Sequence, residues 1–497
     1  MNCLFDALFA KAAPTSPFLI METGALSYGE ALDETGRLGN ALRALGVKPG
    51  DRVAAQVEKS PRALLLYMAC VRIGAIYLPL NTAYTLAELR YFIEDAAPSL
   101  IVCDPAKREG IEAFGLAAVA TLDRLGEGSL AEQAKTAPIA CEPEPRAPED
   151  LAAILYTSGT TGRSKGAMLS HANLLSNADT LVSLWGFTDK DVLIHALPIY
   201  HTHGLFVATN ILMRAGGAMI FRPKFDPAEC IALMPAATAL MGVPTFYTRL
   251  LDQPGLDREA AKSMRLFISG SAPLLAETHR QFEARTGCAI LERYGMTETN
   301  MNTSNPLNGA RIPGTVGLPL PDVALRVADP ETGALLPQGE IGVIEVKGPN
   351  VFKGYWRNPE KTAAEFRADG FFITGDLGRV DENGYVNIVG RGKDLIISGG
   401  FNVYPKEVET EIDALEGVVE SAVIAAPHKD FGEAVVAVVA CGPERPLTEE
   451  QVLAALADRL AKFKQPKRVI FVDDLPRNAM GKVQKAALRE TYKGLFA

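Results

Sequence analysis

The sequence predicts an α/β fold built from several units: parallel sheets flanked by helices in a large N-terminal part, a small β-rich unit, and a compact α+β domain. Three observations support this prediction. Before Gly314, short apolar segments alternate with amphipathic ones, as strands and helices do in parallel-sheet proteins. After Gly314, short apolar segments are separated by Gly and Pro turns, which indicates a β-rich unit. From Leu395 onward the alternation resumes.

The size and charge of the chain limit the possible functions. The 497 residues are 48% hydrophobic and 22% charged. A domain usually contains roughly 100–200 residues, so several packed units are expected. The net charge of −9 and the lack of a Lys or Arg run argue against nucleic-acid binding. A small anionic ligand needs only a local positive site, so a nucleotide remains possible.

The cysteines and the N-terminus predict a cytoplasmic location. The seven cysteines are scattered and never form a Cys-x-x-Cys pair, which is typical of reduced thiols. Asp6 and Lys11 interrupt the apolar N-terminal stretch, so no signal peptide is expected. No stretch of about 18 apolar residues predicts a membrane span.

The N-terminal part has a regular helical pattern over Ser60–Gly74, where apolar residues recur at helical spacing. Strands are predicted at Ala75–Pro79, Leu100–Cys103 and Leu151–Tyr156. The segment Pro138–Glu149 is rich in Pro and Glu, which indicates a surface connection.

The later elements predict where the chain divides. Strands of the β-rich unit are expected at Val323–Val327, Gly342–Lys347 and Tyr385–Val389. The α+β domain is expected to use Val403–Ala414, Ser421–Ala425, Glu433–Ala440, Thr448–Leu460 and Val469–Val472. We place the boundary near Lys393–Leu395, which gives domains 1–393 and 394–497.

The loop Thr157–Lys165 is the strongest functional motif, and it follows an apolar strand. From Tyr156 to Gly166 there are three glycines, five Ser or Thr hydroxyls and one lysine. Backbone N–H groups, hydroxyls and an ammonium suit a polyphosphate. Ser164 stands where a Walker loop needs Gly followed by Lys, and the alternative is a flexible polar turn. After the loop, Ser170 can cap a helix. The predicted phosphate ligands are Thr157, Ser158, Gly159, Thr160, Thr161, Gly162 and Lys165.

With this loop and the motifs that follow it in order, the chain resembles the superfamily of acyl-CoA synthetases, peptide-synthetase adenylation domains and firefly-type luciferases. The resemblance covers nearly the full length. It implies a large N-terminal domain of two doubly wound sheets plus a small β-barrel-like unit, and a small mobile α+β C-terminal domain. It also implies that ATP, with Mg²⁺, activates a carboxylic acid, and that coenzyme A accepts the acyl group.

The motif Tyr294–Glu298 follows the apolar stretch Ala289–Leu291. A carboxylate such as Glu298 suits Mg²⁺, which prefers carboxylate, phosphate and water oxygens. The resemblance assigns Thr297 to the α-phosphate and Glu298, with Thr160, to the metal. Without the resemblance, a helix start with a capping Glu is an equal alternative. Further nucleotide-binding residues implied are Ser271, Ala272, Glu292, Tyr294, Gly295 and Met296.

The motif Thr374-Gly375-Asp376 follows the apolar stretch Gly370–Ile373. A carboxylate at the end of a strand can accept both ribose hydroxyls. The resemblance assigns this role to Asp376, with Arg391 also contacting the ribose. A simple turn is the alternative.

Near the predicted boundary, the resemblance makes Asp394 a hinge for rotation of the C-terminal domain. A salt-bridged linker residue is the alternative. The residues implied in coenzyme A binding are Ser398, Gly399, Gly400 and Phe401. Lys482, in the motif Pro476–Lys482, matches the catalytic lysine and would bridge the carboxylate and the α-phosphate. It is also a predicted target for a lysine acetyltransferase and deacetylase, because acetylation removes the charge.

The acid is predicted from two segments. His195–Gly204 holds three of the six histidines, and His203 is expected to be a catalytic residue in the wall of the acyl pocket with Ser269. A His-x-His metal site is the alternative. Next to an apolar acyl tail, a buried Arg293 guanidinium would have no partner, which is energetically costly, whereas it could pair with a second carboxylate of the substrate. The alternative for Arg293 is a surface ion pair with Glu292 or Asp376.

The combination of Glu292–Asn302 with Pro198–Leu205 resembles malonyl-CoA synthetases, which implies malonate as the substrate. Methylmalonate, a short monocarboxylate or an aromatic acid are rivals within the class. A carrier-protein-loading adenylation enzyme, a luciferase-like oxygenase and a non-catalytic nucleotide-binding protein are rivals outside it.

Overall fold

The computed structural model describes residues 1–157, 164–398, 401–428, 431–442, 447–457, 459–478 and 481–496. These residues form two compact units. Unit 1 contains 1–324 and 346–372, and unit 2 contains 325–345 and 373–497. The predicted domain boundary after Lys393 concerns motion of the C-terminal domain, so it stays a prediction.

Unit 1 contains a sheet whose strands are mainly parallel. The order is β6 (Ala118–Thr121), β5 (Leu100–Cys103), β3 (Arg52–Gln56), β4 (Ile76–Pro79), β7 (Leu151–Thr157) and β8 (Lys165–Ser170). Only the pairing of β7 with β8 is antiparallel among the pairings described for this sheet. The accompanying helices are α2 (Tyr28–Ala44), α3 (Pro61–Arg72), α4 (Leu86–Ala96), α5 (Arg108–Glu112) and α6 (Ser129–Thr136).

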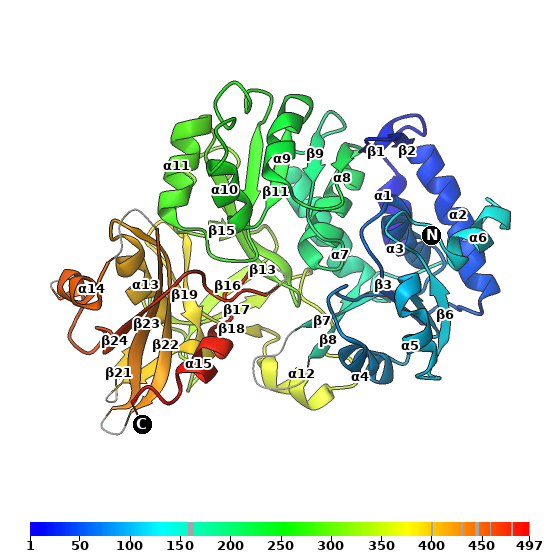
Figure 1. Cartoon of the computed structure of the whole chain (residues 1–497). Coiled ribbons are helices and arrows are strands. Elements are labelled where there is room, and N and C mark those ends of the chain that lie inside the picture. Colours follow the sequence, from blue (N-terminus) through cyan, green and yellow to red (C-terminus); the bar gives the residue numbers. More distant parts are fainter. Residues whose placement is uncertain are drawn as a thin grey trace. The chain divides into compact units, whose positions relative to one another are not determined.

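The second sheet of unit 1 has parallel strands in its centre and antiparallel strands at both edges. The order is β15 (Leu318–Pro319), β14 (Asn300–Ser304), β13 (Ile290–Met296), β12 (Leu266–Ser269), β11 (Ala239–Gly242), β9 (Val192–His195), β10 (Ala218–Phe221), β1 (Pro17–Met21) and β2 (Gly24–Ser27). Its helices are α1 (Cys3–Phe9), α7 (His171–Leu184), α8 (Thr209–Ala215), α9 (Pro227–Leu233), α10 (Pro244–Leu251) and α11 (Ala276–Thr286). Figure 1 shows α9, α10 and α11 beside this sheet, and their apolar residues share one buried core with β11 and β12.

Helices α3 and α7 of unit 1 begin where the sequence predicted. Ser60 caps α3 by accepting a hydrogen bond from the Ala63 N–H at 3.2 Å, and Pro61 occupies the first turn, where its missing N–H is harmless. Ser170 caps α7 in a capping box with Asn173. Strand β8 between the loop and α7 was not predicted.

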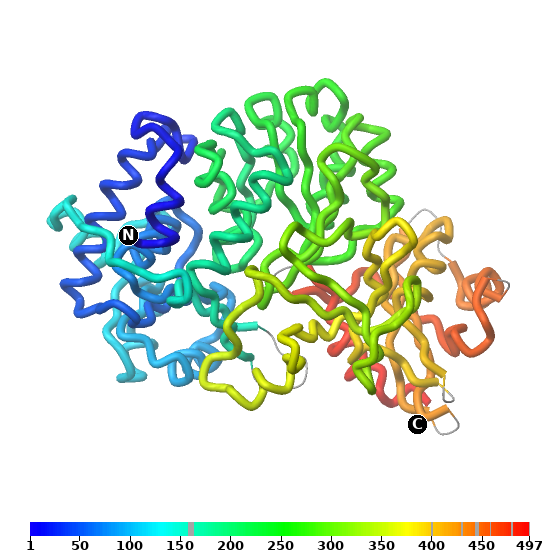
Figure 2. Tube along the Cα trace, turned by 180° about the vertical axis from the view of Figure 1, so that it is seen from behind, coloured from blue at the N-terminus to red at the C-terminus, as the bar shows by residue number. Residues whose placement is uncertain are grey.

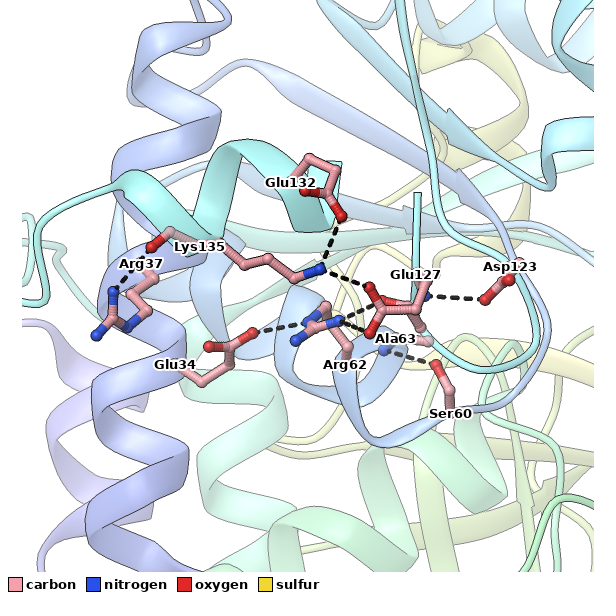
Figure 3. A network of polar contacts seen from close by, with 10 residues as sticks. Glu34, Arg37, Ser60, Arg62, Ala63, Asp123, Glu127, Glu132 and Lys135 are labelled. Atoms are coloured by element: carbon pink, nitrogen blue, oxygen red, sulfur yellow. Dashed lines mark hydrogen bonds and ion pairs between the residues drawn. The ribbon is translucent and has the colours of Figure 1, made fainter. Parts of the chain in front are cut away.

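The segment 138–149 is a surface connection, as predicted. It runs along α2, where Asn40 donates to the carbonyls of Pro138 and Ala140. Figure 2 shows α2 and α6 side by side in this region. The helices are tied together by a charge network: Arg62 of α3 pairs with Glu34 and Glu127, and Lys135 of α6 also reaches Glu127 (Figure 3). This network links α2, α3 and α6, and none of its members is a predicted site residue.

In unit 2, strands β16 (Ala324–Ala328), β17 (Gly342–Lys347), β18 (Phe372–Val380) and β19 (Val386–Arg391) form the β-rich sheet in that order. The ends of this sheet cross the unit boundary, and α12 (Pro359–Glu365) belongs to unit 1. The α+β part contains β21 (Phe401–Val403), β20 (Ile396–Ser398), β23 (Gly432–Cys441), β22 (Val418–His428) and β24 (Arg468–Val472). Its helices are α13 (Pro405–Asp413), α14 (Glu449–Leu456) and α15 (Lys485–Tyr492).

The structure also describes the cysteines, which were predicted to be reduced thiols, and the helices, none of which was predicted to span a membrane. All seven cysteines are free thiols. Among the described residues, no helix combines the length and the apolar character needed to cross a membrane.

Candidate active site

The residues predicted to bind the acid lie at the carboxyl edge of the second sheet of unit 1. Strand β9 ends at His195, β12 ends at Ser269, and β13 continues past that edge as Glu292 and Arg293. The register pairs Gly242 with Ser269 and Ser269 with Glu292, so these residues are neighbours along the edge. The strand order reverses between β10 and β11 on either side of β9, and such a switch point is where open α/β sheets bind ligands.

Arg293 is a buried cation at this edge, only 3% exposed. Its Nε and Nη2 atoms have no hydrogen-bond partner within the described parts of the chain. Burial lowers the pKa of Arg293 to about 9, which still leaves the guanidinium charged at neutral pH. The guanidinium packs over Gly270, where a Cβ would collide with it. The surface alternative for Arg293 is therefore wrong.

His203 and Ser269 are the other two residues predicted to bind the acid. The Nδ1 atom of His203 lies 3.3 Å from the hydroxyl oxygen of Ser271. Burial and the nearby charge of Arg293 lower the pKa of His203 well below its ordinary value, so the ring is neutral at pH 7. Its Nε2 atom and the Ser269 hydroxyl are also buried and have no partner among the residues described. Buried polar atoms normally have partners, so this group of donors fits an anionic ligand such as a carboxylate.

The predicted metal ligand Glu298 and the predicted phosphate ligand Lys165 belong to one chain of contacts. The Tyr355 hydroxyl is 3.1 Å from Glu298 Oε1 and 2.6 Å from Glu365 Oε2. Lys165 Nζ lies 3.5 Å from Glu365 Oε1 and 4.6 Å from the centre of the Tyr355 ring. Burial and both carboxylates raise the pKa of Tyr355, so it stays protonated and donates.

This chain of contacts fits the predicted roles. Thr157 pairs with Lys165 across β7 and β8, which sets the ends of the phosphate loop side by side. Glu298 offers one buried carboxylate, which is how Mg²⁺ is usually held beside phosphate oxygens. The other predicted loop residues, Ser158, Gly159, Thr160, Thr161 and Gly162, lie outside the described residues, so the second predicted metal ligand, Thr160, has no description here.

The nucleotide motif on β13 differs from its local prediction. The strand extends beyond the apolar stretch Ala289–Leu291 to Met296 and is paired with β14. The helix-start alternative for Glu298 is therefore wrong. Gly295 packs against the Asn300 carbonyl so closely that a Cβ would collide with it. The predicted nucleotide ligands of this region in unit 1 are Ser271, Ala272, Glu292, Tyr294, Gly295, Met296 and Thr297.

The structure gives specific constraints for two residues of this set, Ser271 and Glu292. Ser271 adopts a left-handed conformation with φ of 71°, which only a constrained turn imposes on a non-glycine residue. Glu292 is buried, and its Oε1 atom lies 3.5 Å from His279 Nδ1. Ser271 thus lies just after the end of β12, and Glu292 lies within β13.

Unit 2 contains the predicted ribose ligands. Asp376 and Arg391 face each other in the register of β18 and β19, and they form an ion pair at 2.6 Å. Asp376 was expected at the end of a strand after Ile373, which is wrong, because β18 continues to Val380. Asp376 is buried whereas the Arg391 side chain is 41% exposed, so the arginine covers the carboxylate from the solvent side.

Lys482 lies in a hairpin of unit 2. Asn478 N–H donates to the Lys482 carbonyl at 2.9 Å, and Lys482 N–H donates to Asn478 Oδ1 at 3.0 Å. Arg477 forms a β-bridge with Val483 and donates from Nη1 to the Gly481 carbonyl at 2.9 Å. Arg477 also pairs with Glu420 of β22, so the hairpin is attached to the central sheet of this unit.

The predicted hinge and coenzyme A residues also belong to unit 2. Asp394 forms an ion pair with Arg489 of α15 at 2.7 Å. Ser398 is buried opposite Phe401 in the register of β20 and β21. Phe401 is 57% exposed and stacks on Phe463 with ring centres 4.8 Å apart. The other predicted residues of this loop, Gly399 and Gly400, lie outside the described residues.

Sequence reasoning missed three residues of unit 1 that contact the predicted site: Lys59, Tyr355 and Glu365. Each acts through a partner far along the chain, with sequence separations of 136 residues for Lys59 to His195 and 200 for Lys165 to Glu365. No local pattern marks such pairs.

Comparison with known proteins assigns the chain to a family. The sequence model of the AMP-binding enzyme family matches residues 7–356, and that of the AMP-binding enzyme C-terminal domain matches residues 407–482. A feruloyl-CoA synthase from Amycolatopsis is 37% identical over 474 residues, which is 94% of each chain. A malonate–CoA ligase from Arabidopsis thaliana is 35% identical over 84% of this chain and 74% of its own length.

The solved structures agree with these relatives. The ATP-bound crystal structure of MatB from Rhodopseudomonas palustris is 64% identical, with a TM-score of 0.98 and coverage of 100% of both chains. The fold class predicted from the sequence, a mixed α/β architecture with parallel sheets and a separate C-terminal domain, is thereby confirmed.

Proposed function

We propose that this chain, which belongs to the AMP-binding enzyme family, is a malonyl-CoA synthetase. It converts ATP, malonate and coenzyme A into malonyl-CoA, AMP and diphosphate. The observation that carries the choice of acid is the buried guanidinium of Arg293, with two donors that lack a partner among the described residues. The malonate–CoA ligase of Arabidopsis and the full-length similarity to ATP-bound MatB support the same assignment.

In the first half-reaction, a carboxylate oxygen of malonate attacks the α-phosphorus of ATP, the bond to the bridging oxygen breaks, and diphosphate leaves. Arg293 binds the second carboxylate of malonate, and neutral His203 and Ser269 orient the acid. Thr297 and Lys482 contact the α-phosphate, where Lys482 stabilises the charge of the five-coordinate phosphorus. Asp376 and Arg391 hold the ribose.

Magnesium bound at Glu298 and Thr160 would neutralise phosphate charge. Lys165 and the loop from Thr157 to Gly162 hold the β- and γ-phosphates. Lys165 lies 3.5 Å from Glu365, and the Tyr355 hydroxyl contacts both Glu365 and Glu298, so the proposed phosphate and metal ligands belong to one group of side chains.

In the second half-reaction, the thiol of coenzyme A loses its proton, its sulfur attacks the carbonyl carbon of malonyl-AMP, and AMP leaves. Residues 394–497 rotate about Asp394 between the half-reactions, and Ser398, Gly399, Gly400 and Phe401 line the path of the pantetheine arm. We also propose a cytosolic location, in keeping with the free thiols, and acetylation of Lys482 as a means of control.

Diphosphate release across short mono- and dicarboxylates, with and without coenzyme A, tests the proposal. Malonate should give the highest kcat/KM, and malonyl-CoA should form only when coenzyme A is present. A preference for acetate or an aromatic acid would contradict the choice of acid. If methylmalonate is the better substrate, the enzyme is assigned to that acid. If the acyl group is transferred to a carrier protein and not to free coenzyme A, the acceptor is a carrier protein.

A further inference from the structure

Lys59 is a buried lysine that the proposed mechanism does not use, and burial lowers the pKa of its amine well below the ordinary value. It lies in the turn between β3 and α3, and it is 8% exposed. Its Nζ donates to the carbonyls of His195 and Leu197, each at 2.8 Å, and lies 2.9 Å from His195 Nδ1. An ammonium has three N–H donors, so each donor of Lys59 has one acceptor.

His195 passes this contact on to the acid pocket. Because Nδ1 accepts from the ammonium, the neutral ring carries its proton on Nε2, which donates to the Gly204 carbonyl at 2.9 Å. Burial and the charge of Lys59 lower the pKa of His195 well below its ordinary value, so the ring stays neutral. The Thr209 hydroxyl donates to the same Gly204 carbonyl at 3.0 Å. The segment from His195 to Gly204 is therefore fixed at both ends.

These contacts lie at both ends of the segment that carries His203. All three acceptors of Lys59 belong to residues at the start of the segment that carries His203, and the Nε2 bond of His195 ends on the residue directly after His203. A buried ammonium without a carboxylate partner is expensive for stability, and an apolar side chain would fill the space at lower cost. The Phe221 ring, 4.4 Å from Nζ, offsets only part of that cost.

We propose that Lys59 and His195 are positioning residues: together they hold the segment from His195 to Gly204 and so place His203 beside Arg293 in the acid pocket. The inference rests on the proposed function, because His203 and Arg293 are assigned there to the acid. It adds a connection between the two sheets of unit 1, from the carboxyl end of β3 to the carboxyl end of β9.

Substitutions that separate charge from packing test this inference. Lys59→Met keeps the length of the side chain and removes the donors. His195→Leu removes both ring contacts, whereas His195→Gln keeps one acceptor and one donor. Losing hydrogen bonds to a charged group should raise KM for malonate roughly tenfold in Lys59→Met and His195→Leu. KM for ATP should change less than about twofold, since the phosphate ligands lie elsewhere, and His195→Gln should recover most of the malonate affinity.

Lys262→Met is the matched control, because Lys262 is an exposed lysine of the same unit whose loss leaves the pocket intact. Equal KM values for malonate in the wild type, Lys59→Met and His195→Leu would overturn the inference. So would a parallel rise in KM for malonate and ATP, or equal losses in His195→Gln and His195→Leu. If Lys59→Met does not fold, the two His195 variants decide.

Failure of the inference is distinct from failure of the proposed function. If the wild-type enzyme releases no diphosphate with malonate, the proposed function fails. The effects of the variants on KM for the acid and on KM for ATP are then compared with the acid that the enzyme does use. If the wild type is active with malonate and the variants keep its KM, only the positioning role fails.

Discussion

At the scale of single residues, two buried cations of unit 1 differ in how they are satisfied. Lys59 has an acceptor for each of its donors, whereas Arg293 has two nitrogens without a partner in the described chain. Burying a charge without compensation costs several kcal/mol, as a rule. A ligand carboxylate would supply that compensation for Arg293. Hence the difference between the two cations separates a structural contact from a substrate contact.

Arg293→Met should raise KM for malonate by roughly a hundredfold, because it removes a charge-assisted contact to one carboxylate. Acetate lacks that carboxylate, so its KM should change far less. The same variant should melt at a higher temperature without ligand, since an uncompensated buried charge is gone. Diphosphate-release kinetics and thermal unfolding measure both effects.

Arg293→Lys is the matched control, with the charge kept and the bidentate fork lost, and its KM should be intermediate. Unchanged malonate kinetics in Arg293→Met would contradict the charge-pairing role. A lower melting temperature would instead indicate that a protein group compensates Arg293.

His171 should make the stability of unit 1 depend on pH. It is the first residue of α7, and burial lowers its pKa to about 4 from an unfolded value near 6.5. Its Nδ1 accepts from the Leu4 N–H at 3.3 Å. Between pH 6.5 and 4 the unfolded chain binds the proton and the folded chain does not. Stability is therefore lost as pH falls through this window, by at most roughly 3 kcal/mol.

His171→Asn keeps an acceptor near the Nδ1 position and cannot be protonated. Its melting temperature should fall less than that of the wild type between pH 7 and pH 5. Parallel melting curves for the two proteins across this range would rule out His171 as the source of the pH dependence.

At the scale of elements, local patterns predicted those parts of the fold whose signals are local. Caps and periodicity predicted the starts of α3 and α7, and apolar runs predicted β5 and β17 with the observed bounds. The strands that carry the site, β13 and β18, extend beyond the apolar stretches Ala289–Leu291 and Gly370–Ile373, because they continue through polar residues. Polar side chains at a binding edge interrupt the apolar pattern by which a strand is recognised.

Lys482→Ala should abolish adenylate formation and spare the transfer from preformed malonyl-AMP to coenzyme A. The reason lies in the hairpin, where backbone contacts with Asn478 and the Arg477 contact to Gly481 hold the backbone of Lys482 without its side chain. The variant thus removes the charge and leaves the element intact. Diphosphate release measures the first half-reaction, and malonyl-CoA formation from the isolated adenylate measures the second.

Asn478→Ala provides the comparison for this hairpin, because it removes the side-chain contact to Lys482 N–H but keeps the ammonium. It should slow adenylate formation without abolishing it. Equal loss of both half-reactions in Lys482→Ala would contradict the assigned role.

At the scale of the whole molecule, the order of motifs predicted the family, but not how distant residues meet. The compact units place β16 and most of β17 with the C-terminal residues, because Ala328 and Val343 share a small core with Leu395 and Tyr404. Similarly, Lys165 meets Glu365 across 200 residues of sequence. Such contacts depend on tertiary packing, which single-sequence patterns do not contain.

The predicted hinge role of Asp394 can be separated from its ion pair with Arg489. Proline fixes φ near −65° and removes the N–H, so Asp394→Pro should allow at most one of the two arrangements that a rotating domain needs. One half-reaction should therefore slow far more than the other. Asp394→Ala also removes the ion pair but leaves the backbone free, and it should slow neither half-reaction more than about threefold, as for a partly exposed pair. If both variants slow the same half-reaction equally, the ion pair and not the backbone carries the effect, and Asp394 is a salt-bridged linker instead of a hinge.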